Sequence, residues 1–344
     1  MSKYWEQRMQ QRETEAQLIA SKYLARMESR IKAAQQDMIQ QIDRFYANYA
    51  RDNEISLAAA RKYLTSKELK EFKEVDLARF RRMSMSGNRD YDRLLDAISY
   101  RVRISRLESL MTTLELTLLD LYGGVGGLEA YTYSGLMEVY QNTYYKTMFD
   151  FAAAGIAAPN AVKRIAETEM KEILTYNWSG KEFSKRIWGH ETIAKQQIQK
   201  ALERSFANGE SVNNTVKKLM SVTDVSYSRA EALVRTESNV FHTIAANNSY
   251  IDAELERYEI LATLDSRTSD ICRKQDSKVY LVKDFKPGVN APPFHVRCRT
   301  TTIPYFDESE YMQNEQRQSA VGLVKNMSYE QWHEKYVAWE DLDE

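Results

Sequence analysis

Apolar and small side chains recur every three or four positions along residues 3–51, apart from one gap of seven that skips polar Arg12. This spacing follows the ~3.6-residue period of an amphipathic helix and is not a strict heptad. The stripe consists of Trp5, Met9, Ala16, Ile19, Tyr23, Met27, Ile31, Ala34, Met38, Ile42, Phe45 and Tyr49. Such a helix would be about 70 Å long, so it needs a partner surface within this chain or outside it.

Proline is absent before Pro159, and the preceding sequence is rich in good helix formers. Because proline breaks helices, this composition predicts further helices. We expect them at 54–64, 66–82, 89–122 and 128–154. Four glycines at 123–127 interrupt the pattern and predict a tight turn between two helices or a hinge.

Residues 160–252 also have helical character, with Ser211 and Ser226 as candidate N-caps. The last long helix is predicted at 226–252. After this helix, the sequence pattern changes to short segments in which apolar and polar residues alternate and strand formers are common, which predicts strands. These segments are 258–264, 278–282 and 300–305, with a proline-rich loop before the last one.

These elements predict a mainly α protein with long N-terminal amphipathic helices and a small C-terminal α+β domain. We divide the chain into an extended helical N-terminal region at 1–122, a helical middle region at 128–225, an α+β domain at 226–306 and an acidic tail with a short helix at 307–344.

The charge balance argues against a protein that coats nucleic acid along its whole length. The 48 basic and 49 acidic side chains give a net charge of -1, whereas such proteins are strongly basic. Locally, residues 79–106 carry a net +5 and residues 307–344 a net -7. A solvated helix face produces the same asymmetry, but the basic stretch also supplies candidate DNA contacts. These are Arg79, Arg81, Arg82, Arg101, Arg103 and Arg106.

Several classes of protein do not fit the sequence. No window approaches the roughly 18 apolar residues of a membrane span, and the first residues lack the apolar core of a signal peptide. Two cysteines are too few for a secreted disulfide scaffold. The chain also lacks the glycine-rich phosphate-binding loop, followed by Lys-Ser or Lys-Thr, that a packaging ATPase would contain. We therefore expect a protein made in the cytoplasm.

Both cysteines, Cys272 and Cys298, flank His295 in the C-terminal domain. Two thiolates and an imidazole are ligands that suit Zn²⁺. The spacing from His295 to Cys298 can place two of them on one turn, and we expect Cys272 to arrive from a neighbouring strand end. A closed structural site needs a fourth ligand, and none of the nearby aspartates is compelling. These are Asp265, Asp270 and Asp276.

Three interpretations of this cluster stay open. It can bind zinc, or the thiols can pack as small hydrophobes while His295 hydrogen-bonds the proline loop. A Cys272–Cys298 disulfide is the least favoured, because cytoplasm is reducing. A thiol nucleophile with His295 as base and Asp265 as its orienting group is conceivable, but no helix N-terminus obviously activates either thiol.

Arg235 and Glu237 lie two positions apart in a predicted helix, so their side chains point about 200° apart and do not share a face. We expect them to tie the helix to neighbouring loops through buried ion pairs with Asp265 and Arg267, rather than to form one catalytic pair. His242, seven residues after Arg235, could share that residue's face. Asp265–Thr268 is predicted to be a polar turn after a strand.

The order of these groups resembles the C-terminal domain of the phage Mu F-like head morphogenesis, or minor head protein, family. The resemblance rests on Arg235-Thr236-Glu237, on a D-x-R-T-x-x-x-C segment and on a P-P-x-H-x-x-C-R segment. The last two segments supply Asp265, Arg267, Cys272, Pro292, Pro293, His295, Cys298 and Arg299. One departure is Thr300, where the family pattern often has a second cysteine. If metal binding in the family relies on that cysteine, this chain has lost a ligand.

The resemblance implies a minor head protein of a tailed bacteriophage, and not an enzyme. It implies assembly in the host cytoplasm, a final place inside the head near the portal, and roles in head morphogenesis and DNA ejection. The implied partners are the portal protein, capsid or scaffold proteins, and packaged DNA. One alternative is a non-specific DNA-binding ejection protein delivered with the genome. A thiol- or metal-dependent enzyme is a second alternative, but the tail at 307–344 is too short for an added catalytic domain.

Overall fold

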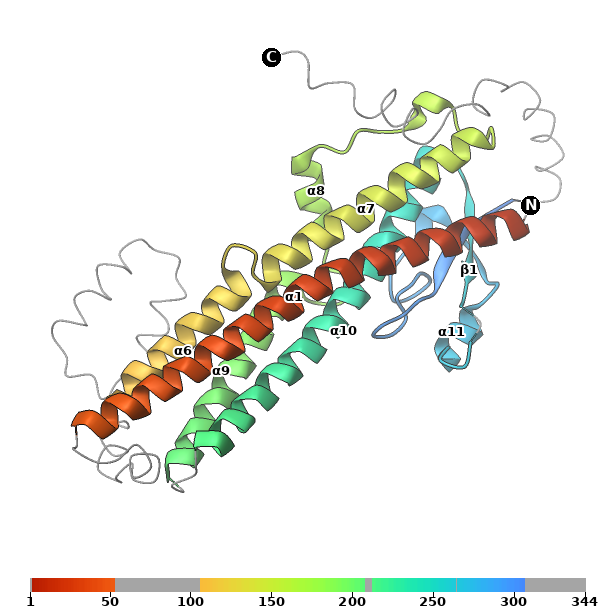
Figure 1. Cartoon of the computed structure of the whole chain (residues 1–344). Coiled ribbons are helices and arrows are strands. Elements are labelled where there is room, and N and C mark those ends of the chain that lie inside the picture. Colours follow the sequence, from red (N-terminus) through yellow and green to blue (C-terminus); the bar gives the residue numbers. More distant parts are fainter. Residues whose placement is uncertain (1, 53–105, 208–211, 264, 307–344) are drawn as a thin grey trace, which may run out of the picture. The chain divides into compact units, whose positions relative to one another are not determined.

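The computed structural model describes residues 2–52, 106–207, 212–263 and 265–306 (Figure 1). Several predictions fall outside these residues. They are the helices at 54–64 and 66–82, the first part of the helix at 89–122, Ser211, the acidic tail, and Arg79, Arg81, Arg82, Arg101 and Arg103. Arg106 is the first residue of a described helix.

The described residues confirm a mainly α fold with a small antiparallel sheet near the C-terminus. The helices are α1 (Ser2–Asp52), α6 (Arg106–Gly123), α7 (Leu128–Ala153), α8 (Glu167–Leu174), α9 (Phe183–Ala207), α10 (Val212–Asp252) and α11 (Asp270–Gln275), with 3-10 turns η1 (Pro159–Ala161) and η2 (Val282–Asp284). The strands are β1 (Arg257–Leu261), β2 (Val279–Leu281) and β3 (Thr301–Tyr305). The predicted long N-terminal helix, the helix at 128–154 and all three strands are present. None of the described helices is both long and apolar enough to cross a membrane.

One predicted helix boundary is wrong. The last long helix was expected to begin at Ser226, but α10 begins at Val212 and continues through that residue. The Ser226 hydroxyl donates a hydrogen bond to the carbonyl oxygen of Val222, 2.9 Å away. A serine that bonds back to the preceding turn in this way is tolerated inside a helix, so its preference for N-caps does not end the element here.

The chain divides into two compact units. The bundle unit comprises Glu28–Gly127 and Trp188–Ser228, and its described part is entirely helical apart from the turn after α6. The sheet unit comprises Met1–Met27, Leu128–Ile187 and Arg229–Glu344, and it contains all three strands. Helices α1, α9 and α10 each contribute one segment to each unit.

In the bundle unit, the second half of the α1 stripe is buried as predicted. Ile31, Met38 and Ile42 are each at most 3% exposed. Leu114 and Leu118 of α6 are buried as well. Burial of such apolar faces supplies the main driving force for packing helices that are amphipathic.

In the sheet unit, a buried arginine occupies the position at which the apolar stripe of α1 is interrupted. Arg12 is 4% exposed, and its Nη2 lies 2.7 Å from Oδ2 of Asp150 on α7. Nη1 of Arg12 also contacts Glu15 Oε1 at 3.1 Å. The pattern therefore continues through position 12, with an ion pair where the other positions place apolar groups.

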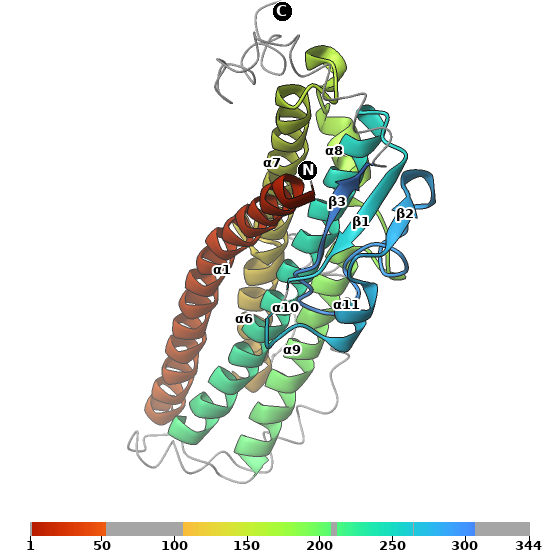
Figure 2. The ribbon, with the colours of Figure 1, turned by 90° about the vertical axis from the view of Figure 1, so that its right-hand side faces the viewer.

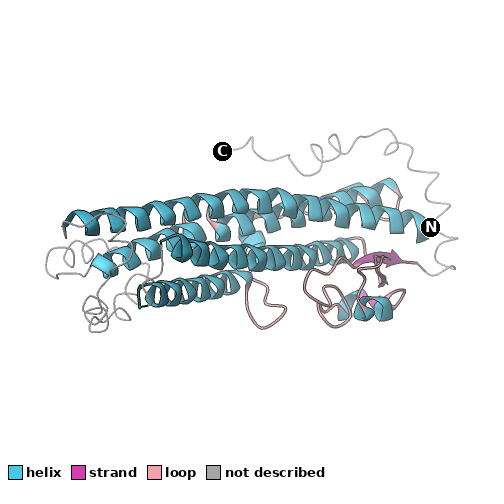
Figure 3. Ribbon diagram, turned by 60° about the horizontal axis from the view of Figure 1, so that its bottom comes forward, coloured by secondary structure: helices cyan, strands magenta, loops and turns pink. Residues whose placement is uncertain are grey.

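The sheet has the strand order β2-β1-β3, with both pairs antiparallel (Figure 2). Tyr258 in β1 lies opposite Tyr280 on one side and Pro304 on the other. Four consecutive residues of β3, 301–304, are buried. The strands, α11 and the loops that join them gather in one part of the sheet unit (Figure 3).

Polar side chains of α10 connect this helix to β3. Asn239 donates to the carbonyl oxygen of Thr300 at 2.9 Å, and Tyr250 donates to that of Thr302 at 3.0 Å. Between them, Nε2 of the fully buried His242 lies 2.8 Å from the Thr301 hydroxyl. The sheet is thus positioned by hydrogen bonds to α10 as well as by apolar burial.

The Arg12–Asp150 pair yields a stability prediction. Asp150→Ala removes the carboxylate on Nη2 of the buried Arg12 and leaves this guanidinium with Glu15 alone, so we expect the free energy of unfolding to fall by about 3 kcal/mol. The double variant Arg12→Met/Asp150→Leu should recover most of this loss, because it removes both charges. Urea unfolding measures both effects. Glu167→Ala, which removes an exposed pair with Lys171, is the control and should leave the midpoint unchanged; an Asp150→Ala midpoint equal to that control contradicts the prediction.

His242 yields a prediction about pH. Burial lowers the pKa of His242 to about 4, below the ~6.5 of an unfolded chain. The unfolded state therefore binds more protons between these values, and this contribution to stability is present above pH 6.5 and is lost as the pH falls towards 4. We expect a loss on the order of 3 kcal/mol over this range. His242→Gln should not show this loss. Unfolding measured at several pH values tests the prediction, and an equal change in the free energy of unfolding with pH in both proteins would refute it.

Candidate functional site

The structure brings Cys272, His295 and Cys298 together. The ligand atoms of the three side chains all lie within 4.8 Å of one another. Cys272 comes from α11, whose N-cap Ser269 accepts from the Cys272 backbone N–H. His295 and Cys298 come from one turn before β3, in which the Cys298 N–H donates to the carbonyl oxygen of His295 at 3.2 Å.

Two expectations about Cys272 are corrected by this placement. It arrives from the short helix α11 and not from a strand end. Cys272 also lies in the first turn of that helix, whereas the sequence showed no helix start near either thiol. The reason is that Ser269 caps a helix too short to produce a periodic pattern.

The two sulfur atoms are in contact without being bonded. Sγ of Cys272 and Sγ of Cys298 lie 3.6 Å apart, and both thiols are free. Nε2 of His295 lies 3.2 Å from Cys272 Sγ. Hydrogen bonding from Cys298 lowers the pKa of Cys272, and the same contact, together with burial, raises the pKa of Cys298. Cys272 is therefore the thiol that more readily supplies a thiolate.

The surroundings of the thiols are apolar. Cys272 and Cys298 form a small core with Ala262, and Phe294 packs against it. The preceding Pro292–Pro293 peptide bond is cis, and both prolines are buried. The two cysteines therefore contribute to the core of the sheet unit, whatever else they bind.

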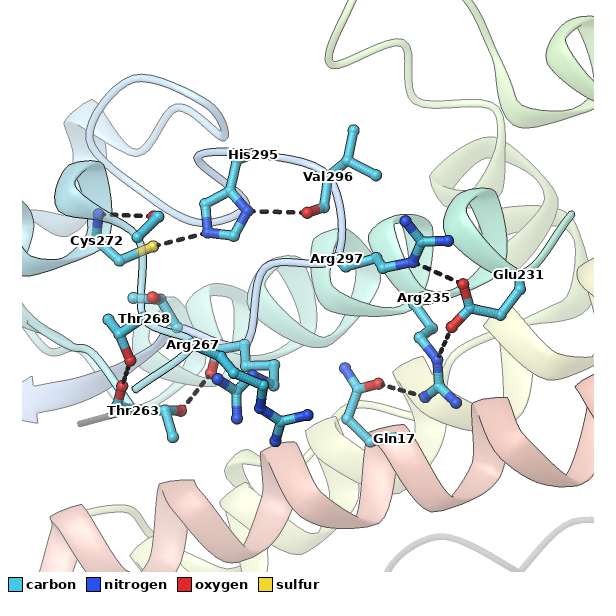
Figure 4. A pocket seen from close by; sticks show the side chains of 13 residues that line it. Gln17, Glu231, Arg235, Thr263, Arg267, Thr268, Cys272, His295, Val296 and Arg297 are labelled. Atoms are coloured by element: carbon cyan, nitrogen blue, oxygen red, sulfur yellow. Dashed lines mark hydrogen bonds and ion pairs between the residues drawn. The ribbon is translucent and has the colours of Figure 1, made fainter. Parts of the chain in front are cut away.

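A cleft of about 730 Å³ opens beside Cys272 and His295. Four arginines line it, one from α10 and three from the loops around the sheet. They are Arg235, Arg267, Arg297 and Arg299. Figure 4 shows Cys272 and His295 at one end of this cleft, and Arg235 and Glu231 at the other.

Two carboxylates hold these arginines in place. Glu231 of α10 lies between Arg235 and Arg297 and forms an ion pair with each, at 2.6 Å from Arg297 Nε. Asp265 accepts two hydrogen bonds from Arg299, both of 2.7 Å. Arg267 is 77% exposed at its side chain and approaches Asp265 only to 3.7 Å. Glu13, whose pKa is raised to about 7, is a third acid near Arg235 and Arg299, so four positive charges outnumber the carboxylates and the cleft attracts anions.

Asp265 organises the loop after β1, as its sequence predicts. Its Oδ1 accepts from the Arg267 backbone N–H at 2.9 Å, and the Thr268 hydroxyl is nearby at 3.2 Å. The bonds from Arg299 lower the pKa of Asp265. Asp265 does not orient His295, because the Nδ1 of His295 is bonded to the carbonyl oxygen of Val296 at 2.8 Å. The arrangement of nucleophile, base and orienting carboxylate that the sequence allowed as a remote alternative is therefore not assembled around Asp265.

Arg235 and Glu237 have separate partners, as their angular separation on the helix predicts. Glu237 is 2% exposed, lies 3.1 Å from Arg186 Nη1 and accepts from the indole N–H of Trp178. Burial raises the pKa of Glu237 to about 7, although both partners lower it. Arg235 contacts Glu231 and Gln17 instead. The expected partners Asp265 and Arg267 were therefore wrong.

Several of these partners could not be identified from the sequence. Arg186, Trp178, Glu231 and Gln17 belong to no motif and lie in three different segments of the chain. Glu13 was also missed; it is 9% exposed, and burial raises its pKa to about 7 while Arg299 and Arg235 lower it. Glu13 is not on the apolar stripe of α1, but it adjoins the gap that Arg12 leaves between Met9 and Ala16, and that gap was the available signal.

No fourth metal ligand joins the cluster among the described residues, where the group consists of three side chains. Asp276 accepts from the Ala262 backbone N–H at 2.8 Å. Asp270 is 85% exposed at its side chain and lies 3.5 Å from Arg273. Thr300, which stands in place of a further cysteine, is buried, and its carbonyl oxygen accepts from Asn239.

Comparison with known proteins identifies one family. Residues 196–303 match the family model described as Phage Mu protein F like protein. The matched segment begins within α9 and ends within β3, so it includes all of α10, the three-residue cluster and most of the residues that line the cleft. No curated protein and no solved structure matches the chain.

The Asp265 contacts generate a prediction about the loop after β1. Asp265→Ala removes both acceptors of Arg299 and the acceptor of the Arg267 N–H, so the loop should open more often. We expect trypsin to cleave after Arg267 several-fold faster in the variant, measured by mass spectrometry of a limited digest. Asp270→Ala, which changes an exposed aspartate nearby, is the control. Equal cleavage rates in both variants and the parent would show that Asp265 does not hold the loop.

Proposed function

Since residues 196–303 make this chain a member of the Phage Mu protein F like family, which is a family of bacteriophage head-related proteins, we propose that it is a minor head protein of a tailed phage. In this role it associates with the portal or procapsid, acts in head morphogenesis and in DNA ejection, and resides in the virion near the portal after assembly in the host cytoplasm. The family match is the observation that carries the proposal.

The use of the motif residues supports a structural role. Thr236 of the Arg-Thr-Glu segment accepts from the Arg297 backbone N–H at 3.0 Å, which ties α10 to the turn that carries His295 and Cys298. Glu237 binds Arg186 at the start of α9. Arg299 binds Asp265. These side chains hold one segment to another, as expected in a protein that presents surfaces to partners, and we assign no catalytic role to them.

The helices supply surfaces of the right kind for the proposed partners. α1 extends over 51 residues and α10 over 41, and residues such as Leu18, at 64% exposure, lie on outer faces. Long helices with partly apolar faces bind other proteins through helix-in-groove contacts. Portal, capsid and scaffold subunits are the partners that this family membership favours.

A second candidate function is favoured by the arginine-lined cleft. Its four arginines outnumber the nearby carboxylates and form a positive site that can neutralise phosphates without sequence preference. This feature supports a DNA-binding ejection protein that leaves the head with the genome. The two functions are compatible, since a portal-associated protein meets the DNA as it passes.

Association with the portal is the first outcome to test. The purified full-length chain is mixed with isolated portal oligomers, empty procapsids and, as a control, capsid protein alone, and each mixture is separated by sedimentation. We expect saturable capture by portal or procapsid at a fixed ratio. If the chain binds none of these partners but binds DNA with an affinity that falls steeply as salt rises, the second function replaces the first.

A further inference from the structure

We propose that Cys272, His295 and Cys298 bind one Zn²⁺ ion and leave its fourth coordination position open to the arginine-lined cleft. The proposal goes beyond the family assignment and does not depend on portal association. Zinc lies about 2.3 Å from sulfur and about 2.0–2.1 Å from imidazole nitrogen, so two ligand atoms on one tetrahedral ion are about 3.5–3.8 Å apart. The sulfur–sulfur separation of 3.6 Å and the nitrogen–sulfur separation of 3.2 Å are close to these values.

The histidine is held in the state that a metal requires. Its Nδ1 lies 2.8 Å from the carbonyl oxygen of Val296. A carbonyl oxygen can only accept a hydrogen bond, so Nδ1 carries the proton. In the neutral ring, Nε2 therefore has the free lone pair, and it lies 3.2 Å from Cys272 Sγ. Histidines that bind metals are commonly oriented in this way, by a backbone carbonyl on the other ring nitrogen.

The surrounding structure benefits from a cross-link at this point. The three strands have five, three and five residues, and the apolar core at the thiols consists of Ala262, Cys272 and Cys298 with Phe294 against it. Because the sheet has few apolar contacts at this point, a metal cross-link would stabilise it locally. Zinc would join α11 to the turn that contains His295 and Cys298, and each thiol would release its proton to solvent on binding.

The fourth position follows from where the cluster lies. Cys272 and His295 both line the cleft, whereas the described residues place no fourth histidine, cysteine or carboxylate in the group. A ligand from solvent therefore completes the coordination. Arg267 and Arg299 line the same cleft, so an anion with an oxygen or nitrogen donor is favoured over neutral water. Three protein ligands and one exchangeable ligand are typical of zinc sites that bind a further molecule.

A disulfide does not explain the geometry. A sulfur–sulfur bond is about 2.05 Å long, whereas these sulfur atoms are 3.6 Å apart and both thiols are free. Packing alone accounts for the burial of the two sulfurs. It does not account for the approach of His295 Nε2 to Cys272 or for the carbonyl partner that fixes its tautomer.

Metal content tests the site. The full-length chain is produced in zinc-supplemented medium, purified without chelator, and analysed for zinc by mass spectrometry and for reactive thiols. We expect about one zinc per chain, and two thiols that become reactive only after a chelator is added. Cys272→Ser, Cys298→Ser and His295→Ala should each lose most of the zinc, while His190→Ala, a histidine of the bundle unit, keeps it.

Wild-type protein without zinc, whether both thiols react freely or form a disulfide, would overturn the proposal. Circular dichroism of each variant shows whether it is folded. Because a cysteine variant can fail to fold, the wild-type protein provides the decisive test. Thiols that react only after zinc is removed by a chelator identify the ligands without any substitution.

Cobalt tests the open position. Co²⁺ replaces zinc in the wild-type protein, and its visible absorption reports a four-coordinate ion with sulfur ligands. Azide, a small anion, is then titrated in. We expect the visible bands to shift with saturation, and Arg267→Gln, which removes an exposed charge from the cleft, to weaken azide binding several-fold. If the visible bands do not change at any azide concentration, the fourth coordination position is closed. That result would overturn the open position without contradicting zinc binding.

Discussion

β3 imposes the constraint on which the sheet unit depends. Residues 301–304 of this strand are buried, yet β3 pairs with β1 on one side only. Buried backbone groups must be hydrogen-bonded, so the other side of β3 needs partners. Tyr250 of α10 donates to the carbonyl oxygen of Thr302 in β3, Asn239 donates to that of Thr300 just before the strand, and His242 contacts the Thr301 hydroxyl. Side chains of α10 thus bind β3 on the side that faces away from β1, and Thr236 of the same helix binds the backbone of the turn that carries His295 and Cys298.

The same helix determines the electrostatics of the cleft. Glu231 and Arg235 lie one turn apart on α10 and form an ion pair, while Thr236 and Glu231 bind the backbone and the side chain of Arg297. The turn that contains His295 and Cys298 is therefore attached to α10 through Arg297. A change on one face of α10 would move the cluster and the arginines together.

The sequence predicts the parts of this structure that depend on local pattern. The period of α1, the positions of the three strands, the Asp265 turn and the spacing of His295 and Cys298 are all local, and the structure confirms them. The predictions that were wrong concern features that depend on residues far away in the sequence or on short elements such as α11. Arg12 was set aside as polar because its partner Asp150 lies far along the chain. Glu237 was assigned the wrong partner because Arg186 belongs to no motif. The start of α10 was misplaced because a serine fits inside a helix as well as at its beginning.

Buried charge in the sheet unit is arranged in a way that separates holding from binding. In the Arg12–Asp150 and Arg186–Glu237 pairs, a nearly inaccessible carboxylate contacts a guanidinium from another helix, so these charges hold helices together. Around the cleft, the carboxylates Glu231 and Asp265 are partly exposed and are outnumbered by arginines. An excess of positive charge at a hollow surface costs self-repulsion unless an anion relieves it. A fold that keeps this excess beside two thiols and an oriented imidazole has a surface better suited to binding a ligand than to filling a core.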